Sequence, residues 1–399
     1  MRSEWKSCSL DDLAKFENGK SLSPALYSSD GANPVFGSNG EIAKTNEELN
    51  SDSVISIGRV GAYCGSVYLI KTPSWVTDNA IIAKPKGDND LRYLYYRLLS
   101  LDLRRTAIGS AQPLMTQGGL KIIETTVPSS LTQKAIADIL GSLDDKIELN
   151  RKTNETLEAM AQAIFKSWFI DFDPVHAKSK GRQPDGMDAE TAKLFPSSFQ
   201  DSEIGMVPKG WEAKRLDEVL MAKNDRCGEM NVPEYSSTND GLQLRSERFT
   251  KQLSVSTSAN KLIKQGDLVF GLSRQVLNFG LMRDPVGGVS AAYKVFAVDE
   301  NAIIPDLLER MIRMRSGYFF NALSASSREG QSVSSDGLGR LRFVQPSSAV
   351  QVAFYEVTEG ILQQSKCLQQ ESRSLVSLRD ELIPRLLSGE ITIPVSKVA

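Results

Sequence analysis

Several short fragments of the sequence resemble catalytic motifs, and each lacks a residue that the chemistry requires. Asn33-Pro-Val-Phe36 is similar to the N-P-P-F/Y loop with which amino-methyltransferases hold a flipped base, but Val35 stands where the second proline belongs. No G-x-G-x-x-G loop follows an expected strand to hold a methyl donor. Gly19-Lys-Ser21 matches the end of a phosphate-binding loop, but Ala14 replaces its first glycine. We expect the first fragment to be a turn before Gly37 and the second to be a chance match.

Histidine and cysteine, common catalytic and metal-binding residues, are scarce. The single histidine, His176, lies in a polar stretch where we expect an exposed loop residue. Asp171 and Asp173 could pair, but we expect them to be solvated at a helix end. The four cysteines are scattered and form no C-x-x-C pair, at Cys8, Cys64, Cys227 and Cys367. This pattern argues against a zinc site or disulfides and suits the cytosol, so we expect no catalytic, metal or cofactor site on this chain and a cytoplasmic location.

The remaining polar candidates suit nucleic-acid recognition, which needs Lys and Arg for phosphates and Arg, Lys, Asn or Gln for base edges. Arg59 directly follows an expected strand, Val54–Ile57, beside glycines that permit close approach. Arg274 occupies the matching place after a second strand, Asp267–Phe270. The alternative is a surface arginine beside a turn. The candidate DNA-binding residues are Lys20, Arg59, Lys84, Lys86, Gln112, Arg245, Arg248, Lys251, Lys261, Arg274 and Gln331.

The composition is that of a globular protein, and it does not by itself indicate a nucleic-acid partner. The 399 residues are 41% hydrophobic and 24% charged, with a formal net charge of −2. This length exceeds one ordinary core and predicts at least two domains. A strongly basic balance would favour nucleic-acid binding, and its absence counts mildly against that function. No apolar run is long enough for a membrane span, and the N-terminus lacks the apolar stretch of a signal peptide.

The chain repeats itself at long period, which indicates two related halves. The segment Trp5–Leu13 matches Trp211–Val219, and Pro128–Gln133 matches Pro346–Gln351. Between these anchors, strand-like apolar runs follow in the same order, with Val54–Ile57 and Ala80–Ala83 matched by Asp267–Phe270 and Tyr293–Val298. The second copy carries additional residues inside its globular part.

Each copy ends in a long helix whose apolar residues repeat every seven positions, which predicts a coiled coil. The first helix has Ile136, Leu143, Leu157 and Ile164 on this grid, with a second row of Leu140, Ile147, Asn154, Ala161 and Trp168. The second helix has Phe354, Ile361, Leu368, Leu375 and Leu382. Thirty-eight helical residues span about 57 Å. Central polar residues, Asn150 and Asn154 in one helix and Gln364 and Glu371 in the other, leave parallel and antiparallel pairing open.

These patterns define the expected domain boundaries. Globular domains are expected at 1–130 and 211–345, long helices at 131–172 and 346–390, a linker at 173–210 and a tail at 391–399. The first helix ends in aromatic residues on more than one face. Two helices alone cannot cover them, so we expect a docking surface for another subunit, or else cover from the adjoining domain. These residues are Phe165, Trp168, Phe169 and Phe172.

Taken together, these segments resemble the specificity subunits of type I restriction–modification enzymes over almost the whole chain. The resemblance rests first on Trp5…Leu10-Asp-Asp-Leu13 and Pro34-Val-Phe-Gly-Ser-Asn-Gly40. Further matching segments are Gln133…Ile136-Ala-Asp-Ile-Leu140, Ile147-Glu-Leu-Asn-Arg151, Phe165-Lys-Ser-Trp-Phe-Ile-Asp-Phe-Asp-Pro174, Pro208-Lys-Gly-Trp211…Leu216-Asp-Glu-Val219 and Leu382-Ile-Pro-Arg-Leu-Leu-Ser-Gly-Glu-Ile391. Individually these motifs are weak, and their order and duplication make them specific.

The resemblance implies an α+β fold: two mixed α/β target recognition domains separated by two long antiparallel helices, related by a pseudo-two-fold repeat. It implies that each domain reads one half of a split double-stranded DNA site. Two methyltransferase subunits would carry S-adenosylmethionine, and two motor–nuclease subunits would carry ATP and Mg²⁺. No catalytic residue of those partners carries over to this chain.

Two other functions remain open from the sequence. A coiled-coil scaffold with two protein-binding heads and no DNA role would fit the weak basic bias, which is only 18 Lys and Arg against 16 Asp and Glu between Trp211 and Gln345. A stand-alone DNA methyltransferase is disfavoured by the missing motifs.

Overall fold

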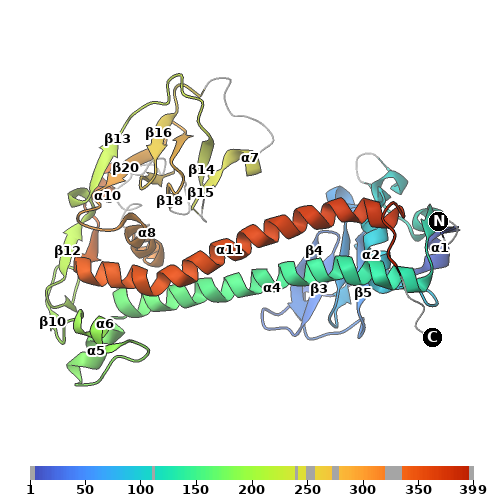
Figure 1. The fold of residues 1–399 in the computed structure, drawn as a ribbon, viewed down its shortest axis with the longest axis horizontal. Coiled ribbons are helices and arrows are strands. Elements are labelled where there is room, and N and C mark those ends of the chain that lie inside the picture. The colour runs from blue at the N-terminus through green and yellow to red at the C-terminus, as the bar shows by residue number, and fades with distance from the viewer. Residues whose placement is uncertain are drawn as a thin grey trace. The chain divides into compact units, whose positions relative to one another are not determined.

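Two long helices and several small β-sheets are the main elements of this protein in the computed structural model (Figure 1). The structure describes residues 5–109, 113–238, 241–248, 257–271, 278–319 and 335–394. The chain divides into unit 1, formed by Met1–Glu155 and Lys366–Ala399, and unit 2, formed by Thr156–Ser365. Each unit therefore contains part of both long helices, α4 (Ser130–Phe169) and α11 (Ser348–Leu387).

Unit 1 contains two main sheets, and two separate apolar cores pack against their strands. The four-stranded antiparallel sheet has the order β2-β8-β5-β6, formed by Ala14–Asn18 (β2), Ala80–Pro85 (β8), Val54–Gly58 (β5) and Val67–Ile70 (β6). The second sheet has the order β4-β3-β7, formed by Gly40–Thr45 (β4), Asn33–Gly37 (β3) and Trp75–Val76 (β7). Lys6–Ser9 (β1) pairs with Glu124–Val127 (β9). The helices of this part are α1 (Leu10–Leu13), α2 (Leu91–Ser100) and α3 (Gln117–Lys121).

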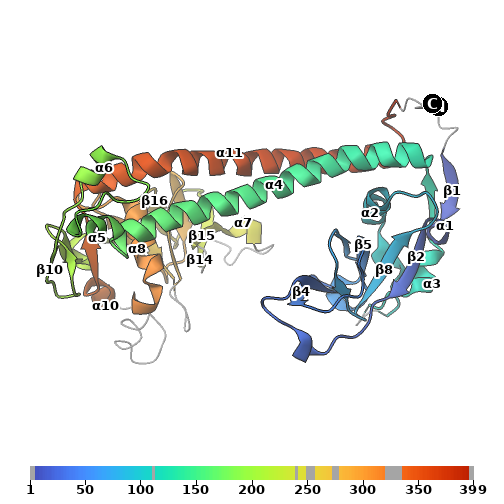
Figure 2. The ribbon, with the colours of Figure 1, turned by 90° about the horizontal axis from the view of Figure 1, so that it is seen from below.

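The central strands of unit 1 are buried on both faces, which explains their uninterrupted apolar sequences. Ile55 of β5 and Ile81 of β8 face a core that includes Tyr93 of α2 and Ile136 of α4. The alternate residues of the same strands, such as Val54, face a smaller core with Val76 of the second sheet. Figure 2 shows α2 between the sheet and α4.

Unit 2 repeats this arrangement and adds one strand to its second sheet. Its first sheet has the order β13-β20-β17-β18, formed by Leu220–Lys223 (β13), Lys294–Val298 (β20), Leu268–Phe270 (β17) and Phe279–Leu281 (β18). Its second has the order β15-β14-β19-β16, formed by Gly241–Leu244 (β15), Glu234–Thr238 (β14), Val286–Val289 (β19) and Lys261–Lys264 (β16). Glu212–Arg215 (β12) pairs with Arg342–Gln345 (β21). The helices are α7 (Arg245–Arg248), α8 (Pro305–Met314) and α10 (Ser335–Gly339).

The strand order confirms the repeat predicted from sequence. Strands β5 and β8 are central in unit 1, and their predicted counterparts β17 and β20 are central in unit 2. In both units a parallel strand pair, β3 with β7 and β14 with β19, lies in the second sheet. The additional residues of the second copy include α7 and β16, for which the described part of unit 1 has no counterpart.

A buried glutamine occupies the same position in both units. Gln133 accepts a hydrogen bond from the backbone N–H of Asp90 and donates to the carbonyl of Pro128. Gln351 accepts from the N–H of Ile304 and donates to the carbonyl of Pro346. Each side chain thus joins the start of a long helix to the residue before α2 or α8. The repeat therefore extends to single hydrogen bonds.

The long helices run antiparallel, which settles the question that the heptads left open. In unit 1, Asp144 of α4 binds Arg379 of α11 at 2.8 Å, and Asn150 donates to Glu371 at 2.8 Å. Contacts thus move backward along α11 as they move forward along α4. In unit 2, Phe354 near the start of α11 contacts aromatic rings near the end of α4, among them Phe165.

The predicted polar layer is partly correct. Asn150 is buried and bonds to Glu371, whose carboxylate also lies 3.3 Å from the ammonium group of Lys146. Gln364, in contrast, is exposed to solvent. The heptad grid misplaced it because the α-helical repeat of 3.6 residues drifts against a repeat of seven.

Two local expectations were wrong. Asn33–Gly37 forms strand β3 rather than a turn, and the turn follows it, between Gly37 and Gly40. Residues 173–210 are not a linker, although turn formers are abundant there. They contain α5 (Asp173–Ser179), α6 (Ala189–Lys193) and the hairpin of β10 (Phe199–Gln200) with β11 (Val207–Pro208). The apolar side chains of this segment, among them Val175, Phe195 and Val207, are buried in the core of unit 2.

Candidate nucleic-acid interface

Lys20 and Arg59 are far apart in sequence and lie at the same end of the first sheet of unit 1, just after β2 and β5. The backbone N–H of Lys20 donates to Val76, and that of Arg59 donates to Asn79, each at 2.9 Å. The guanidinium of Arg59 also donates to the carbonyl of Asp78 at 3.1 Å. Both cations therefore adjoin the turn between β7 and β8, because β2 and β5 flank β8 on either side and end beside its start.

The loop after Arg59 is held by backbone contacts and carries an exposed aromatic ring. Ser38 accepts a hydrogen bond from the N–H of Val60 at 3.2 Å. A Cβ on Gly58 would lie 2.3 Å from the carbonyl oxygen of Tyr63, so only glycine fits there. The close approach predicted at this glycine thus serves the chain's own packing. Tyr63 is 49% exposed and is available for stacking.

Lys84 and Lys86 lie toward the other end of β8 and differ in their surroundings. Lys84 faces Lys15 of β2 across the strands. A hydrogen bond from Lys15, together with the charges of Lys84 and Lys20, lowers the pKa of Glu17. Three lysines therefore surround one carboxylate, and the excess positive charge suits phosphates.

Lys86 is a structural residue. Its ammonium group donates to the backbone carbonyl of Asp11 and lies 3.1 Å from the Asp11 carboxylate. This hydrogen bond lowers the pKa of Asp11, with a smaller contribution from Lys121. Lys86 therefore holds α1 to the end of β8, and its role as a DNA contact stays a prediction.

In unit 2 the structure describes only some of the candidates. Arg245 donates to Ser236 at 3.0 Å and lies 4.0 Å from Glu234, so it is anchored inside the second sheet. Lys261 is 6% exposed rather than solvated. The remaining candidates lie outside the described residues or, for Arg248, have an undescribed side chain; they are Gln112, Arg248, Lys251, Arg274 and Gln331.

The prediction of an aromatic docking surface on α4 is wrong. Phe165, Trp168 and Phe169 are between 1% and 6% exposed and lie in the core of unit 2. Phe172 is half-buried against the same core, with its ring 5.8 Å from that of Trp211. The segment after α4 folds back over these rings, which satisfies the alternative that the adjoining domain covers them.

Sequence reasoning missed Lys15, Tyr63, Arg226 and Lys294. Lys15 is a candidate only because it lies opposite Lys84, and this pairing cannot be read from the sequence without the strand register. Arg226 lies next to Lys261 through an isolated β-bridge that no local pattern predicts.

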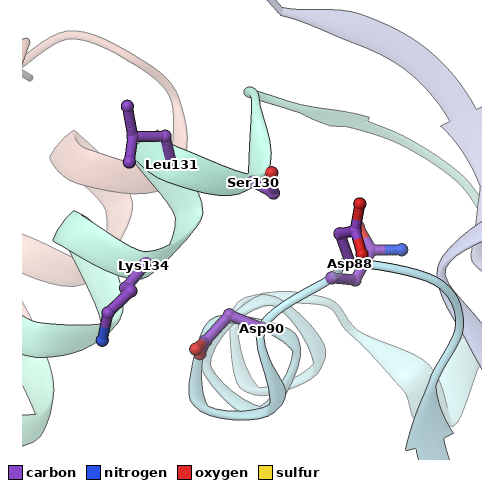
Figure 3. Close-up of a pocket in the computed structure, with 6 residues that line it drawn as sticks. Asp88, Asp90, Ser130, Leu131 and Lys134 are labelled. Atoms are coloured by element: carbon purple, nitrogen blue, oxygen red, sulfur yellow. The ribbon is translucent and has the colours of Figure 1, made fainter. Parts of the chain in front are cut away.

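A pocket of about 380 Å³ lies at the start of α4 in unit 1 (Figure 3). The loop before α2 contributes Asp88 and Asp90, and the first turns of α4 contribute Ser130, Leu131 and Lys134. The carboxylate of Asp90 accepts from the N–H of Tyr93, so it caps α2 rather than forming a catalytic pair. Among the described residues, no group of three His, Cys, Asp or Glu side chains could hold a metal.

The duplicated sheet domains and the antiparallel pair of long helices define a two-part fold that can be compared with known proteins. Residues 2–159 match the family model of the type I restriction modification DNA specificity domain. The chain is 26% identical, over 70% of its length and 71% of the relative's, to the type I restriction enzyme HindI specificity subunit of Haemophilus influenzae. It is 23% identical, over 82% of its length and 76% of the relative's, to the MjaIX specificity subunit of Methanocaldococcus jannaschii.

The fold is similar to that of a solved protein as well. The S subunit of a type I restriction–modification system from M. genitalium matches with a TM-score of 0.63 over 96% of both chains, at 16% identity. The chain is thus similar in sequence to type I restriction enzyme specificity subunits and similar in fold to one solved S subunit. No helix in the described ranges is long and apolar enough to cross a membrane.

Proposed function

We propose that this chain binds double-stranded DNA in a sequence-specific manner and directs a type I restriction–modification complex to a split target. The observation that carries the proposal is the duplication. Each unit contains a four-stranded sheet of the same strand order, and in unit 1 Lys20 and Arg59 lie where β2 and β5 end. A protein with two related readers is suited to a target with two half-sites.

The two long helices supply the second part of the proposal. They are paired by polar contacts such as Asp144–Arg379 and by aromatic contacts such as Phe165–Phe354. A paired helix bends less than a single one, so it can fix the spacing between two half-sites. We propose that the helices act as this spacer.

Catalysis is assigned to partners. We propose that the chain has no activity of its own and that two methyltransferase subunits, with S-adenosylmethionine, modify the target. Two motor–nuclease subunits with ATP and Mg²⁺ would complete the restriction form. All four cysteines are free thiols, which agrees with action in the reducing cytoplasm.

The direct test is genome-wide methylation calling in cells that express this chain with its cognate methyltransferase subunit. We expect methylation at one bipartite motif with a fixed gap, and none when either protein is expressed alone. Methylation by the purified chain with methyl donor alone would contradict the non-catalytic assignment.

A protein-binding scaffold without a DNA role is separated by a gel-shift at two salt concentrations. Phosphate-driven binding weakens steeply as salt rises. Absence of any shift at low salt would favour the scaffold.

A further inference from the structure

Lys261 is a buried lysine with other cations, and no carboxylate, as its charged neighbours. It is 6% exposed and lies on β16. Ile263 is two positions further along the strand and therefore on the same face. Ile263 is fully buried in the second core of unit 2, with Val289 and Val295. The stem of Lys261 therefore lies along the edge of an apolar core.

Two further cations adjoin this side chain. Arg226 forms a β-bridge with Lys261, and its guanidinium is held at 2.6 Å by the carbonyl of Ala259. Lys294 begins β20, and its charge acts on Lys261. Burial lowers the pKa of Lys261, and the charges of Lys294 and Arg226 lower it further.

The nearest acidic side chains of this region are engaged elsewhere or point to solvent. Glu234 accepts from Asn260 at 2.7 Å and lies 4.0 Å from Arg245. Asp225 is exposed and contributes its backbone carbonyl to Leu262. Within the ranges that the structure describes, no carboxylate within 4.0 Å matches the charge of Lys261.

A buried, unmatched ammonium group destabilises a fold, and an apolar side chain of similar length would avoid that cost. An anion bound beside these cations would offset the cost of the buried charge. We propose that Lys261, with Lys294 and Arg226, forms a site for one phosphate group of the DNA backbone. The inference rests on the proposed function and assigns a phosphate contact to unit 2.

The phosphate is favoured over a base edge because of the residues' chemistry. The three cations provide charge but no acceptor for a base, and the amide of the neighbouring Asn260 is already bonded to Glu234. A phosphate contact adds affinity on every sequence and releases condensed counterions. Its loss therefore has a signature that loss of a base contact lacks.

The test measures DNA affinity against salt concentration for the original full-length chain and for its Lys261→Met variant. The two probes are a labelled random-sequence duplex and the target duplex found by methylation mapping. We expect the slope of log affinity against log salt to become less steep by about 0.9, which is a roughly eight-fold loss of affinity at 0.1 M salt. The loss should be equal on both duplexes. The urea midpoint should stay the same or rise, because the buried charge is gone.

Two variants serve as controls. Lys193→Met removes the same charge from an exposed residue that pairs with Glu190, and it should leave the slope unchanged. Lys261→Arg should retain the slope. If Lys261→Met does not fold, the double variant Arg226→Gln with Lys294→Gln replaces it, since Arg226 is exposed and Lys294 half-buried.

The possible failures are distinguishable. If the original chain binds neither duplex, the proposed function is wrong and the inference with it. If the original chain binds and Lys261→Met keeps its slope, only the phosphate site is wrong. A loss confined to the target duplex would also overturn it, because that result indicates a base contact.

Discussion

At the residue scale, single polar side chains hold the start of each long helix in place. Gln133 and Gln351 are 2% and 3% exposed, and each bonds to backbone groups at two separate points of its unit. A buried amide of this kind is costly to remove, because its partners lose their hydrogen bonds without regaining water. The repeat in sequence thus reflects a repeated requirement for hydrogen bonding.

Replacing Gln351 with Leu should destabilise unit 2 by about 1–3 kcal/mol. The N–H of Ile304 and the carbonyls of Ala302 and Pro346 would lose a partner. Urea unfolding followed by fluorescence should show a lower midpoint. Gln183→Leu is the control, because Gln183 is exposed and makes one local bond to Met187. Equal midpoints for the two variants would refute the structural role.

At the element scale, an ion network joins α8 to α11 in unit 2. Asp306 accepts from the guanidinium of Arg310 at 2.6 Å and from the hydroxyl of Tyr355 at 3.0 Å. Burial alone would raise the pKa of Asp306, but the neighbouring charges of Arg310 and Arg283 outweigh it, and the pKa is lowered. The contact therefore depends on an ionised carboxylate.

The pH dependence follows from that direction. A lowered pKa in the folded state stabilises the fold above the pKa of an unfolded aspartate, about 3.9, and the contribution is lost as pH falls further. Unfolding midpoints of the original chain should fall between about pH 5 and pH 3, and Asp306→Asn should show a smaller fall. An equally steep fall in the variant would show that Asp306 is not linked to acid unfolding.

The polar layer of the helix pair gives a prediction of opposite sign. Asn150 is 1% exposed, and its partner Glu371 keeps a second contact with Lys146. A buried asparagine in a seam sets register at a cost in stability. Asn150→Leu should therefore raise the urea midpoint. Leu149→Asn, at an exposed neighbouring position, is the control and should change the midpoint little. A lower midpoint for Asn150→Leu would mean that the bond to Glu371 stabilises the seam.

At the scale of the whole molecule, the proposed spacer predicts a change in target. Deleting one facing heptad from each helix, Thr156–Gln162 and Glu359–Ser365, keeps the seam pattern and shortens it by about 10 Å. This corresponds to about three base pairs at 3.4 Å each. Methylation mapping should then return the same half-sites with a shorter gap. A control with both heptads retained but exposed residues exchanged should keep the original gap, and an unchanged gap in the deletion would refute the spacer.

Elements whose pattern is periodic or duplicated could be predicted from the sequence alone. The heptads predicted both long helices, and the matched segments predicted the order of β5 and β8 and of their counterparts β17 and β20. Repetition preserves these features because each copy must fill the same core.

Which polar and aromatic side chains are buried or have a charged partner could be seen only in the tertiary structure. The turn formers at 173–210 gave no sign that this segment covers Trp168. Lys86 donates a hydrogen bond to the backbone carbonyl of Asp11, which is far away in the sequence. The surroundings of Lys261 likewise depend on Arg226 and Lys294, which come from other strands. Burial and charge matching arise between segments far apart in the chain, and local spacing carries no information about them.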